Sequence, residues 1–149
     1  MSTDRRVQVT KRFTLEMAHA LRDHDGPCKH IHGHSYVLDV TLTGEPLDRT
    51  GDPKNGMVMD FADLKAIVKR CVVDHYDHAL VLHESERGAI NADHPLFART
   101  RFTPWQPTCE YLLLDMVTRI RAELPTGAYL SQVRLQETAT SWAVWEDGE

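Results

Sequence analysis

The chain has 149 residues, 42% of them hydrophobic and 26% charged, with a formal net charge of -5; these values exclude a disordered protein, a fibrous protein and a basic nucleic-acid binder. No apolar run reaches the roughly 20 residues that a membrane helix needs, and the N-terminus lacks the apolar stretch of a secretory signal. We therefore expect a cytoplasmic protein with one domain over residues 1–149, and no nucleic-acid or membrane partner.

Two strands are predicted in the first third of the chain. Residues 7–19 carry apolar side chains at alternate positions, the period of a half-buried strand, and His19 falls on the apolar face. Residues 32–42 repeat the alternation, and His32 and His34 begin one of its two faces. A histidine therefore ends the first strand, and two more open the second.

Two helices are predicted next. Residues 44–56 are rich in Gly, Pro and Asp and read as a loop, after which Asp60 can cap a helix that should end near residues 74–78. Thr108 can cap a second helix, which should stop before Pro125. Both helices carry an apolar stripe that must pack on a sheet.

The segment between the two helices and the C-terminal part complete the prediction. Residues 83–107 show no clear period and contain three prolines, so we expect an inserted loop there. Residues 129–137 and 142–145 predict two further strands. The order strand, strand, helix, helix, strand, strand favours an α+β fold, with an antiparallel sheet and both helices on one face.

The histidines indicate a metal site. His32 and His34 are two apart on a strand, so their rings leave one face about 6.5 to 7 Å apart, a separation that one zinc ion can bridge. His19 on the neighbouring strand can supply a third ligand. Three neutral nitrogens and an open fourth position describe a catalytic zinc site rather than a structural one. The alternative is a chance grouping of strand-end histidines.

Cysteines add a possible reactive group. Cys28, Cys71 and Cys109 are an odd number at wide spacing, which does not indicate a disulfide framework. Cys28 lies four residues before His32, so it is either a fourth zinc ligand or a base or nucleophile beside the metal. Cys71 reads as a core residue, and Cys109, at a helix N-terminus, is a second candidate reactive thiol.

Carboxylates beside histidines offer proton-transfer groups. Asp74-His75 and Asp77-His78 both lie near the end of the first helix, and each is either an acid–base pair or a pair of ordinary helix-end residues. Glu137 continues an apolar strand face, where a carboxylate needs a partner such as a ligand's donors.

Five ordered motifs resemble one known family, the 6-pyruvoyl-tetrahydropterin synthases and their bacterial relatives, the 6-carboxy-tetrahydropterin synthases of the queuosine and deazapurine pathway. The motifs are residues 13–19 (FTLEMAH), 28–34 (CKHIHGH), 56–61 (GMVMDF), 107–110 (PTCE) and 136–138 (QET). The resemblance runs through nearly the whole chain.

This resemblance implies the tunnelling fold, in which each subunit contributes a four-stranded antiparallel sheet with two helices. Sheets from several subunits then close a barrel, which would also cover exposed sheet edges. Family members are typically homohexamers made of two stacked trimers, with active sites at subunit interfaces.

The resemblance also assigns roles to residues. It implies Zn²⁺ as cofactor, held by His19, His32 and His34, and Cys28 as the proton acceptor. It implies that Glu137 anchors the pterin ring and belongs to the catalytic proton relay, with Thr108 and Glu110 near the pterin pocket.

For the catalytic Asp-His pair, Asp77-His78 matches the family pattern better than Asp74-His75, because it lies farther from Asp60 and is followed by leucines. Two departures are His83, where the family often has Asn, and residues 84–104, which are longer than in compact bacterial members.

The implied substrate is 7,8-dihydroneopterin triphosphate. The short spacing from Cys28 to His34 resembles the enzymes that release acetaldehyde and triphosphate and form 6-carboxy-tetrahydropterin. The alternative product is 6-pyruvoyl-tetrahydropterin; the branch that makes a hydroxymethyl-dihydropterin typically replaces the cysteine by glutamate. Lys29 and Lys54 are candidate contacts for the triphosphate.

Two alternatives of another class stay open from the residues alone. A three-histidine zinc site could activate water for hydrolysis, in which case Cys28 would be dispensable. The chain could also be a zinc-stabilised structural module, in which Cys28 closes the coordination sphere.

Overall fold

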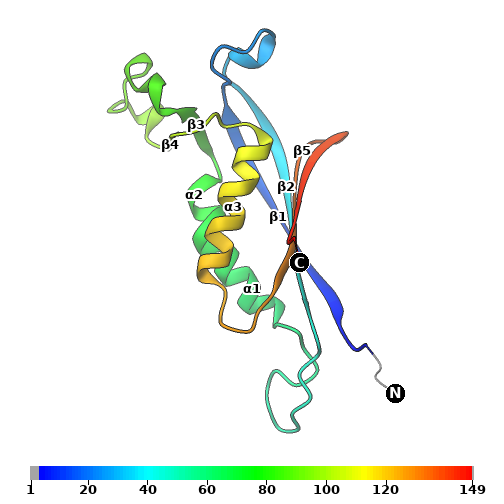
Figure 1. Cartoon of the computed structure of the whole chain (residues 1–149). Helices are drawn as coiled ribbons and strands as arrows, with labels where there is room; N and C mark the ends of the chain where they lie inside the picture. The colour runs from blue at the N-terminus through cyan, green and yellow to red at the C-terminus, as the bar shows by residue number, and fades with distance from the viewer. Residues whose placement is uncertain (1–3, 149) are drawn as a thin grey trace.

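Residues 4–148 are described by the computed structural model of the chain, which contains one six-stranded sheet (Figure 1). Its strands are β1 (Val7–His19), β2 (His32–Gly44), β3 (Ala79–His83), β4 (Thr100–Thr103), β5 (Leu130–Thr138) and β6 (Ser141–Glu146). Their order across the sheet is β4-β3-β1-β2-β5-β6.

The antiparallel sheet predicted from the sequence is present, but its size was predicted wrongly. Strands β1, β2, β5 and β6 pair antiparallel as expected. Strands β3 and β4 extend this sheet beyond β1 by parallel pairing, so each chain has six strands and not four. Runs of five and four residues are too short to display a clear period in the sequence.

Two helical segments lie against the sheet. The first comprises α1 (Phe61–Val68), a wider π-helical turn η2 (Lys69–Val73) and α2 (Asp74–Tyr76); the second is α3 (Cys109–Glu123). Both predicted caps are present, because Asp60 accepts a hydrogen bond from the amide of Ala62 and Thr108 accepts one from the amide of Tyr111. The first segment ends at Tyr76, within the predicted range.

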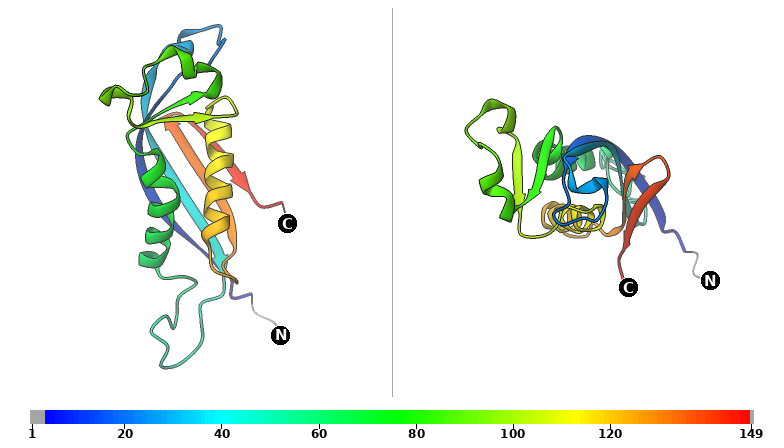
Figure 2. Two further views of the ribbon diagram at one scale, coloured as in Figure 1. Left: turned by 90° about the vertical axis from the view of Figure 1, so that its left-hand side faces the viewer. Right: turned by 90° about the horizontal axis from the view of Figure 1, so that it is seen from above.

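Both helical segments cover the same face of the sheet (Figure 2). The core between them is formed by alternate residues of β1 and β2 and by the apolar stripes of the helices, including Leu15, Met17, Tyr36, Leu38, Leu64, Val68, Leu112 and Met116. Each such side chain contributes about 1.5–3 kcal/mol when fully buried. Positions 15, 17 and 19 of β1 therefore point toward the helices, and position 16 points away from them.

The segment over residues 83–107 is more regular than an inserted loop. It contains two short 3-10 helices, η3 (Glu84–Ala89) and η4 (Pro95–Phe97), followed by strand β4. We refer to residues 83–107 as the inserted segment. None of the helices within residues 4–148 is both long and apolar enough to cross a membrane.

Candidate metal centre and active site

Three histidine rings converge where β1 ends and β2 begins. His19 pairs with His32 in the strand register, and His34 pairs with Met17, so all three rings leave the face that the helices cover. The ligand nitrogens lie within 4.8 Å of one another. The cluster predicted from the sequence is therefore formed within a single chain.

Hydrogen bonds on the far side of two rings fix the nitrogens that face the centre. Nδ1 of His19 lies 2.7 Å from the carbonyl oxygen of Pro107, and Nδ1 of His32 lies 2.7 Å from the carbonyl oxygen of His30. A carbonyl only accepts, so each Nδ1 carries the proton and each Nε2 offers a lone pair. This is the tautomer of a histidine that binds a metal through Nε2.

Two nitrogens at the centre are buried without a hydrogen-bond partner among residues 4–148. Nε2 of His19 and Nε2 of His34 make no hydrogen bond to any residue within 4–148. Burial lowers the pKa of His19 below its ordinary value, against the opposing effect of its bond to Pro107, which favours the neutral ring. A metal ion would satisfy both orphaned atoms, and three neutral imidazoles suit zinc.

A carboxylate from β5 lies next to this centre. Oε1 of Glu137 is 3.9 Å from Nε2 of His34, and the hydroxyl of Tyr36 donates to Oε2 of Glu137 over 3.4 Å. The Glu137 side chain remains 25% exposed, so a ligand can still reach it. Tyr36 was not predicted as a site residue from the sequence; its signal was its position on the same strand face as His32 and His34.

Cys28 lies in the loop that joins His19 to His32, within the short 3-10 helix η1 (Pro27–Lys29). Its thiol is half-buried, and it is not among the ligand atoms that converge in residues 4–148. A role as fourth ligand is thus not supported by this geometry. This loop begins after His19 and ends before His32. Cys28 therefore lies at the same end of the sheet as the three histidines.

Cys109 is unsuited to be the reactive thiol. It is 9% exposed, and its sulfur donates to the carbonyl of Leu135 over 3.4 Å. Burial, assisted by the charges of Glu137 and Glu110, raises the pKa of Cys109 to about 12. The thiol therefore stays protonated at neutral pH.

The pair Asp77-His78 follows α2 directly and precedes β3. Nδ1 of His78 lies 3.1 Å from Oδ2 of Asp77, and Oδ1 of Asp77 accepts a hydrogen bond of 2.9 Å from the amide of Glu16. Partial burial opposes ionisation of Asp77, but the Glu16 amide and His78 outweigh it and lower the pKa of the carboxyl. The His78 side chain is 72% exposed.

The competing pair Asp74-His75 is arranged differently. Asp74 forms an ion pair with Lys69, and Nε2 of His75 lies 3.3 Å from Nη2 of Arg119. Burial, followed by the charges of Arg119 and Arg101, lowers the pKa of His75 to about 4. Of the two pairs, Asp77 and His78 contact each other, whereas Asp74 is paired with Lys69.

Thr108 and Glu110 both lie in the first turn of α3 or at its cap. Thr108 immediately follows Pro107, whose carbonyl holds His19, so this turn is attached to the metal centre. The hydroxyl of Thr108 is used in capping, through the bond of 3.2 Å from the amide of Tyr111. Glu110 is exposed.

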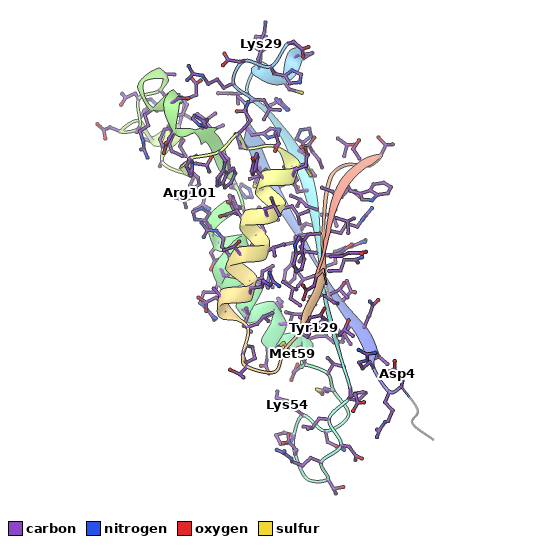
Figure 3. The ribbon with its side chains drawn as sticks, viewed as in Figure 1. Asp4, Lys29, Lys54, Met59, Arg101 and Tyr129 are labelled. Atoms are coloured by element: carbon purple, nitrogen blue, oxygen red, sulfur yellow. The ribbon has the colours of Figure 1, made fainter. Side chains whose placement is uncertain are left out.

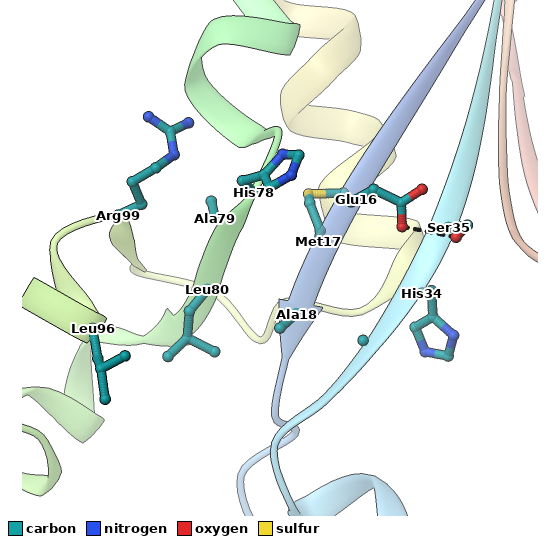
Figure 4. A pocket seen from close by; sticks show the side chains of 11 residues that line it. Glu16, Met17, Ala18, His34, Ser35, His78, Ala79, Leu80, Leu96 and Arg99 are labelled. Atoms are coloured by element: carbon teal, nitrogen blue, oxygen red, sulfur yellow. Dashed lines mark hydrogen bonds between the residues drawn. The ribbon is translucent and has the colours of Figure 1, made fainter.

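The proposed catalytic groups do not all meet within one chain. Among residues 4–148, no hydrogen bond, ion pair or ring contact connects Cys28 or the pair Asp77-His78 to the three histidines. Figure 4 shows the β1 ribbon running between His78 and the ring of His34. Both lysines considered for the triphosphate lie apart as well: Figure 3 shows Lys29 and Lys54 at opposite ends of the molecule, and Lys54 is paired with Asp60.

Comparisons with known proteins identify the family of this chain. The profile of the family described as 6-pyruvoyl tetrahydropterin synthase matches residues 8–148. A Haemophilus influenzae protein named 6-carboxy-5,6,7,8-tetrahydropterin synthase is 34% identical over 94% of this chain and 99% of its own length.

Solved structures show the same fold. A Wolinella succinogenes protein superposes with a TM-score of 0.77 at 21% identity, covering 95% of this chain and 98% of that one. The Caenorhabditis elegans 6-pyruvoyl tetrahydropterin synthase superposes with a TM-score of 0.70 at 25% identity, covering 96% of each chain. The chain therefore belongs to the 6-pyruvoyl tetrahydropterin synthase family.

Proposed function

We propose that this chain is a zinc-dependent 6-carboxy-5,6,7,8-tetrahydropterin synthase, which converts 7,8-dihydroneopterin triphosphate and water to 6-carboxy-tetrahydropterin, acetaldehyde and triphosphate in queuosine and deazapurine biosynthesis. The observation that carries the proposal is the pair of buried, unpartnered Nε2 atoms of His19 and His34 beside His32. The name of the Haemophilus influenzae relative supports the carboxy product.

The three histidines would hold the metal through Nε2, with Pro107 and the carbonyl of His30 fixing two of the rings. A bound zinc ion would supply Lewis-acid polarisation of a substrate oxygen. The open fourth position follows from the absence of a fourth converging ligand among the described residues, and it would admit the substrate.

Proton transfer would fall to Cys28 and His78. In this proposal the sulfur of Cys28 accepts a proton from the substrate side chain, and the imidazole of His78 returns a proton. Asp77 holds the imidazole by its 3.1 Å contact with Nδ1, which leaves Nε2 of His78 to exchange protons.

Recognition of the pterin would fall to Glu137. Its carboxylate can accept two hydrogen bonds from the amino group and a ring N–H of the pterin, and the hydroxyl of Tyr36 orients it. Thr108 and Glu110, in the turn attached to His19 through Pro107, would line the same pocket.

A homohexamer built as a dimer of trimers would complete this site. Strands β4 and β6 end the sheet within the chain, and unpaired edges favour pairing with further copies. Because Asp77-His78 does not contact the histidines of its own chain, a neighbouring copy would bring its pair to the centre. Light scattering tests the hexamer, and mixing the inactive variants Cys28→Ala and His78→Ala tests the shared site, since mixed oligomers should regain partial activity.

The second candidate is 6-pyruvoyl-tetrahydropterin synthase, supported by the family description and the Caenorhabditis elegans structure. The zinc hydrolase and the structural module receive no comparable support. The position of Cys28 outside the converging ligand set also argues against a structural site closed by that thiol.

Product identification tests the proposed function. The zinc-loaded protein is incubated with 7,8-dihydroneopterin triphosphate, and acetaldehyde, triphosphate and the pterin mass are followed. We expect acetaldehyde with 6-carboxy-tetrahydropterin, lost in Cys28→Ala and retained in the matched thiol variant Cys71→Ala. Triphosphate with a pyruvoyl product and no acetaldehyde would move the chain to the second candidate, and no turnover would reject both.

A further inference from the structure

The inserted segment touches the turn that carries Asp77 and His78. Arg99, directly before β4, donates from Nε and Nη2 to the carbonyl oxygen of Asp77, over 3.2 and 2.7 Å, and from Nη2 to the carbonyl oxygen of Asp74 over 3.2 Å. Within residues 4–148, no carboxylate forms an ion pair with Arg99. Its guanidinium therefore forms hydrogen bonds with backbone carbonyls at the end of α2.

This contact satisfies groups that the helix cannot satisfy itself. The last carbonyls of a helix have no partner in the next turn, and a cation there also interacts favourably with the helix dipole. A second arginine of the same segment, Arg101, donates to the carbonyl of His75 over 2.9 Å. The two arginines therefore both donate to backbone carbonyls at the end of this helix, but only Arg99 donates to the carbonyl of Asp77.

The turn beyond this helix end has an unfavourable backbone conformation. His78 has a φ of 62°, in the left-handed region, which costs roughly 1–2 kcal/mol for a residue with a Cβ. Such a conformation persists only where its surroundings hold it. On one side it is held by β1, because the amide of His78 donates to the carbonyl of Glu16 over 2.6 Å and Asp77 accepts from the amide of Glu16. Arg99 holds the other side.

The direction of the His78 side chain depends on this turn. His78 and Arg99 line one cavity of about 400 Å³, together with Glu16 and Ser35 from β1 and β2, as Figure 4 shows. Glu16 and Ser35 belong to the sheet face opposite the helices, and His34 also lines the cavity. A change at the Asp77 carbonyl would rotate the peptide that precedes His78 and redirect its ring.

We propose that Arg99 is a positioning residue, which clamps the carbonyl of Asp77 so that the imidazole of His78 points into this cavity in a single orientation. The inference rests on the proposed function, in which His78 transfers a proton. In this proposal the inserted segment provides Arg99, whose hydrogen bonds to the carbonyl of Asp77 hold the acid–base pair in place. Arg99 itself does not contact the substrate.

Three variants test this role. Arg99→Met keeps the length of the side chain and removes its donors, and Arg99→Lys restores a single cationic donor. Arg101→Met is the matched control, because it removes the same charge from the same segment and the same helix end without touching Asp77. For each variant, kcat and KM for 7,8-dihydroneopterin triphosphate, the zinc content and the oligomeric state are measured.

We expect Arg99→Met to lower kcat by about 10- to 100-fold, the loss typical of a misplaced catalytic group. KM should change by less than about threefold, and zinc content and assembly should match the wild type. Arg99→Lys should recover part of kcat, and Arg101→Met should stay near the wild type. A raised KM with unchanged kcat would overturn the proposal, because Arg99 would then bind substrate. Equal losses in Arg99→Met and Arg101→Met would also overturn it.

Amide hydrogen exchange gives a readout that does not require turnover. In Arg99→Met, exchange of the His78 amide should accelerate by at least about tenfold relative to the wild type, since opening of the turn needs less free energy, while Arg101→Met should leave it near the wild-type rate. Unchanged exchange in Arg99→Met would overturn the positioning role. If the wild type shows no turnover but the exchange results hold, the proposed function fails and the clamp itself stands.

Discussion

His19 and Pro107 are 88 residues apart in the chain, yet Nδ1 of His19 lies 2.7 Å from the carbonyl oxygen of Pro107. The contact joins the last residue of β1 to the residue that precedes the cap of α3. It sets the tautomer of one metal-centre ring and connects the centre to the turn with Thr108 and Glu110. The metal centre and the proposed pterin pocket are therefore mechanically linked.

Loss of the His34 ring should weaken zinc binding. Its Nε2 is buried and has no hydrogen-bond partner within residues 4–148, and a metal ion would satisfy it. We expect His34→Gln to bind zinc at least about tenfold more weakly than the wild type, measured by competition with a chelator. His94→Gln is the control, because the His94 ring accepts from the amide of Leu96 and contacts Phe97 in the inserted segment and is not among the converging histidines. Equal affinity in His34→Gln and the wild type would contradict the assignment.

Removal of the α3 cap should lower both the free energy of unfolding and the zinc affinity. Thr108→Ala removes the acceptor for the amide of Tyr111 and should lower the free energy of unfolding by about 1 kcal/mol, measured by urea denaturation of the zinc-free protein. Because Pro107 precedes the cap, zinc affinity should also fall. Thr108→Ser retains the hydroxyl and should lose neither; an equal loss in both variants would refute the capping explanation.

His75 should make the protein less stable in mild acid. Its pKa is lowered to about 4 by burial and by Arg119 and Arg101, whereas in the unfolded chain it is about 6.5. The unfolded state therefore binds the proton more tightly, and stability is lost as pH falls from about 7 to 4. Because His75 is partly exposed, solvent screening reduces the effect to about 1 kcal/mol.

The measurement for His75 is a comparison of two proteins. The free energies of unfolding of zinc-free wild type and His75→Gln are determined by urea denaturation at pH 7.5 and 5. The two proteins differ only at residue 75, so the difference between their pH dependences isolates His75. We expect a smaller loss of stability in the variant, and the same loss in both proteins would contradict the prediction.

Cys109 should resist alkylation in the native protein. Its thiol is buried, donates to Leu135 and has a pKa of about 12, so almost no thiolate is present at pH 8. Peptide mass mapping after iodoacetamide treatment should find Cys109 unmodified until urea unfolds the chain. Rapid native modification of Cys109 would show that this thiol, and not only Cys28, is available for chemistry.

The long elements and the metal cluster could be predicted because each follows from one local pattern. The alternation over β1 and β2 places His19, His32 and His34 on one face, and side-chain direction in a strand requires only the period of two. Asp60 and Thr108 cap their helices as their positions before apolar stripes predict. No long-range information was needed for these features.

The remainder depends on contacts between distant segments. Strand β4 has four residues and pairs with β3, which has only five, so its identity is decided by the parallel edge that β3 offers. Tyr36 lay on the predicted face, but its bond to Glu137 depends on the register between β2 and β5. The support of Asp77 by Arg99 joins residues of the helix end and the inserted segment, which show no common period.

The most direct test of the account is zinc titration of metal-free protein during turnover of 7,8-dihydroneopterin triphosphate, with acetaldehyde formation as the measured rate. If His19, His32 and His34 form the catalytic metal centre, the metal-free protein is inactive and the rate rises linearly to a break at one zinc per chain. Acetaldehyde formation without zinc, or a rate that does not respond to zinc, would contradict the account.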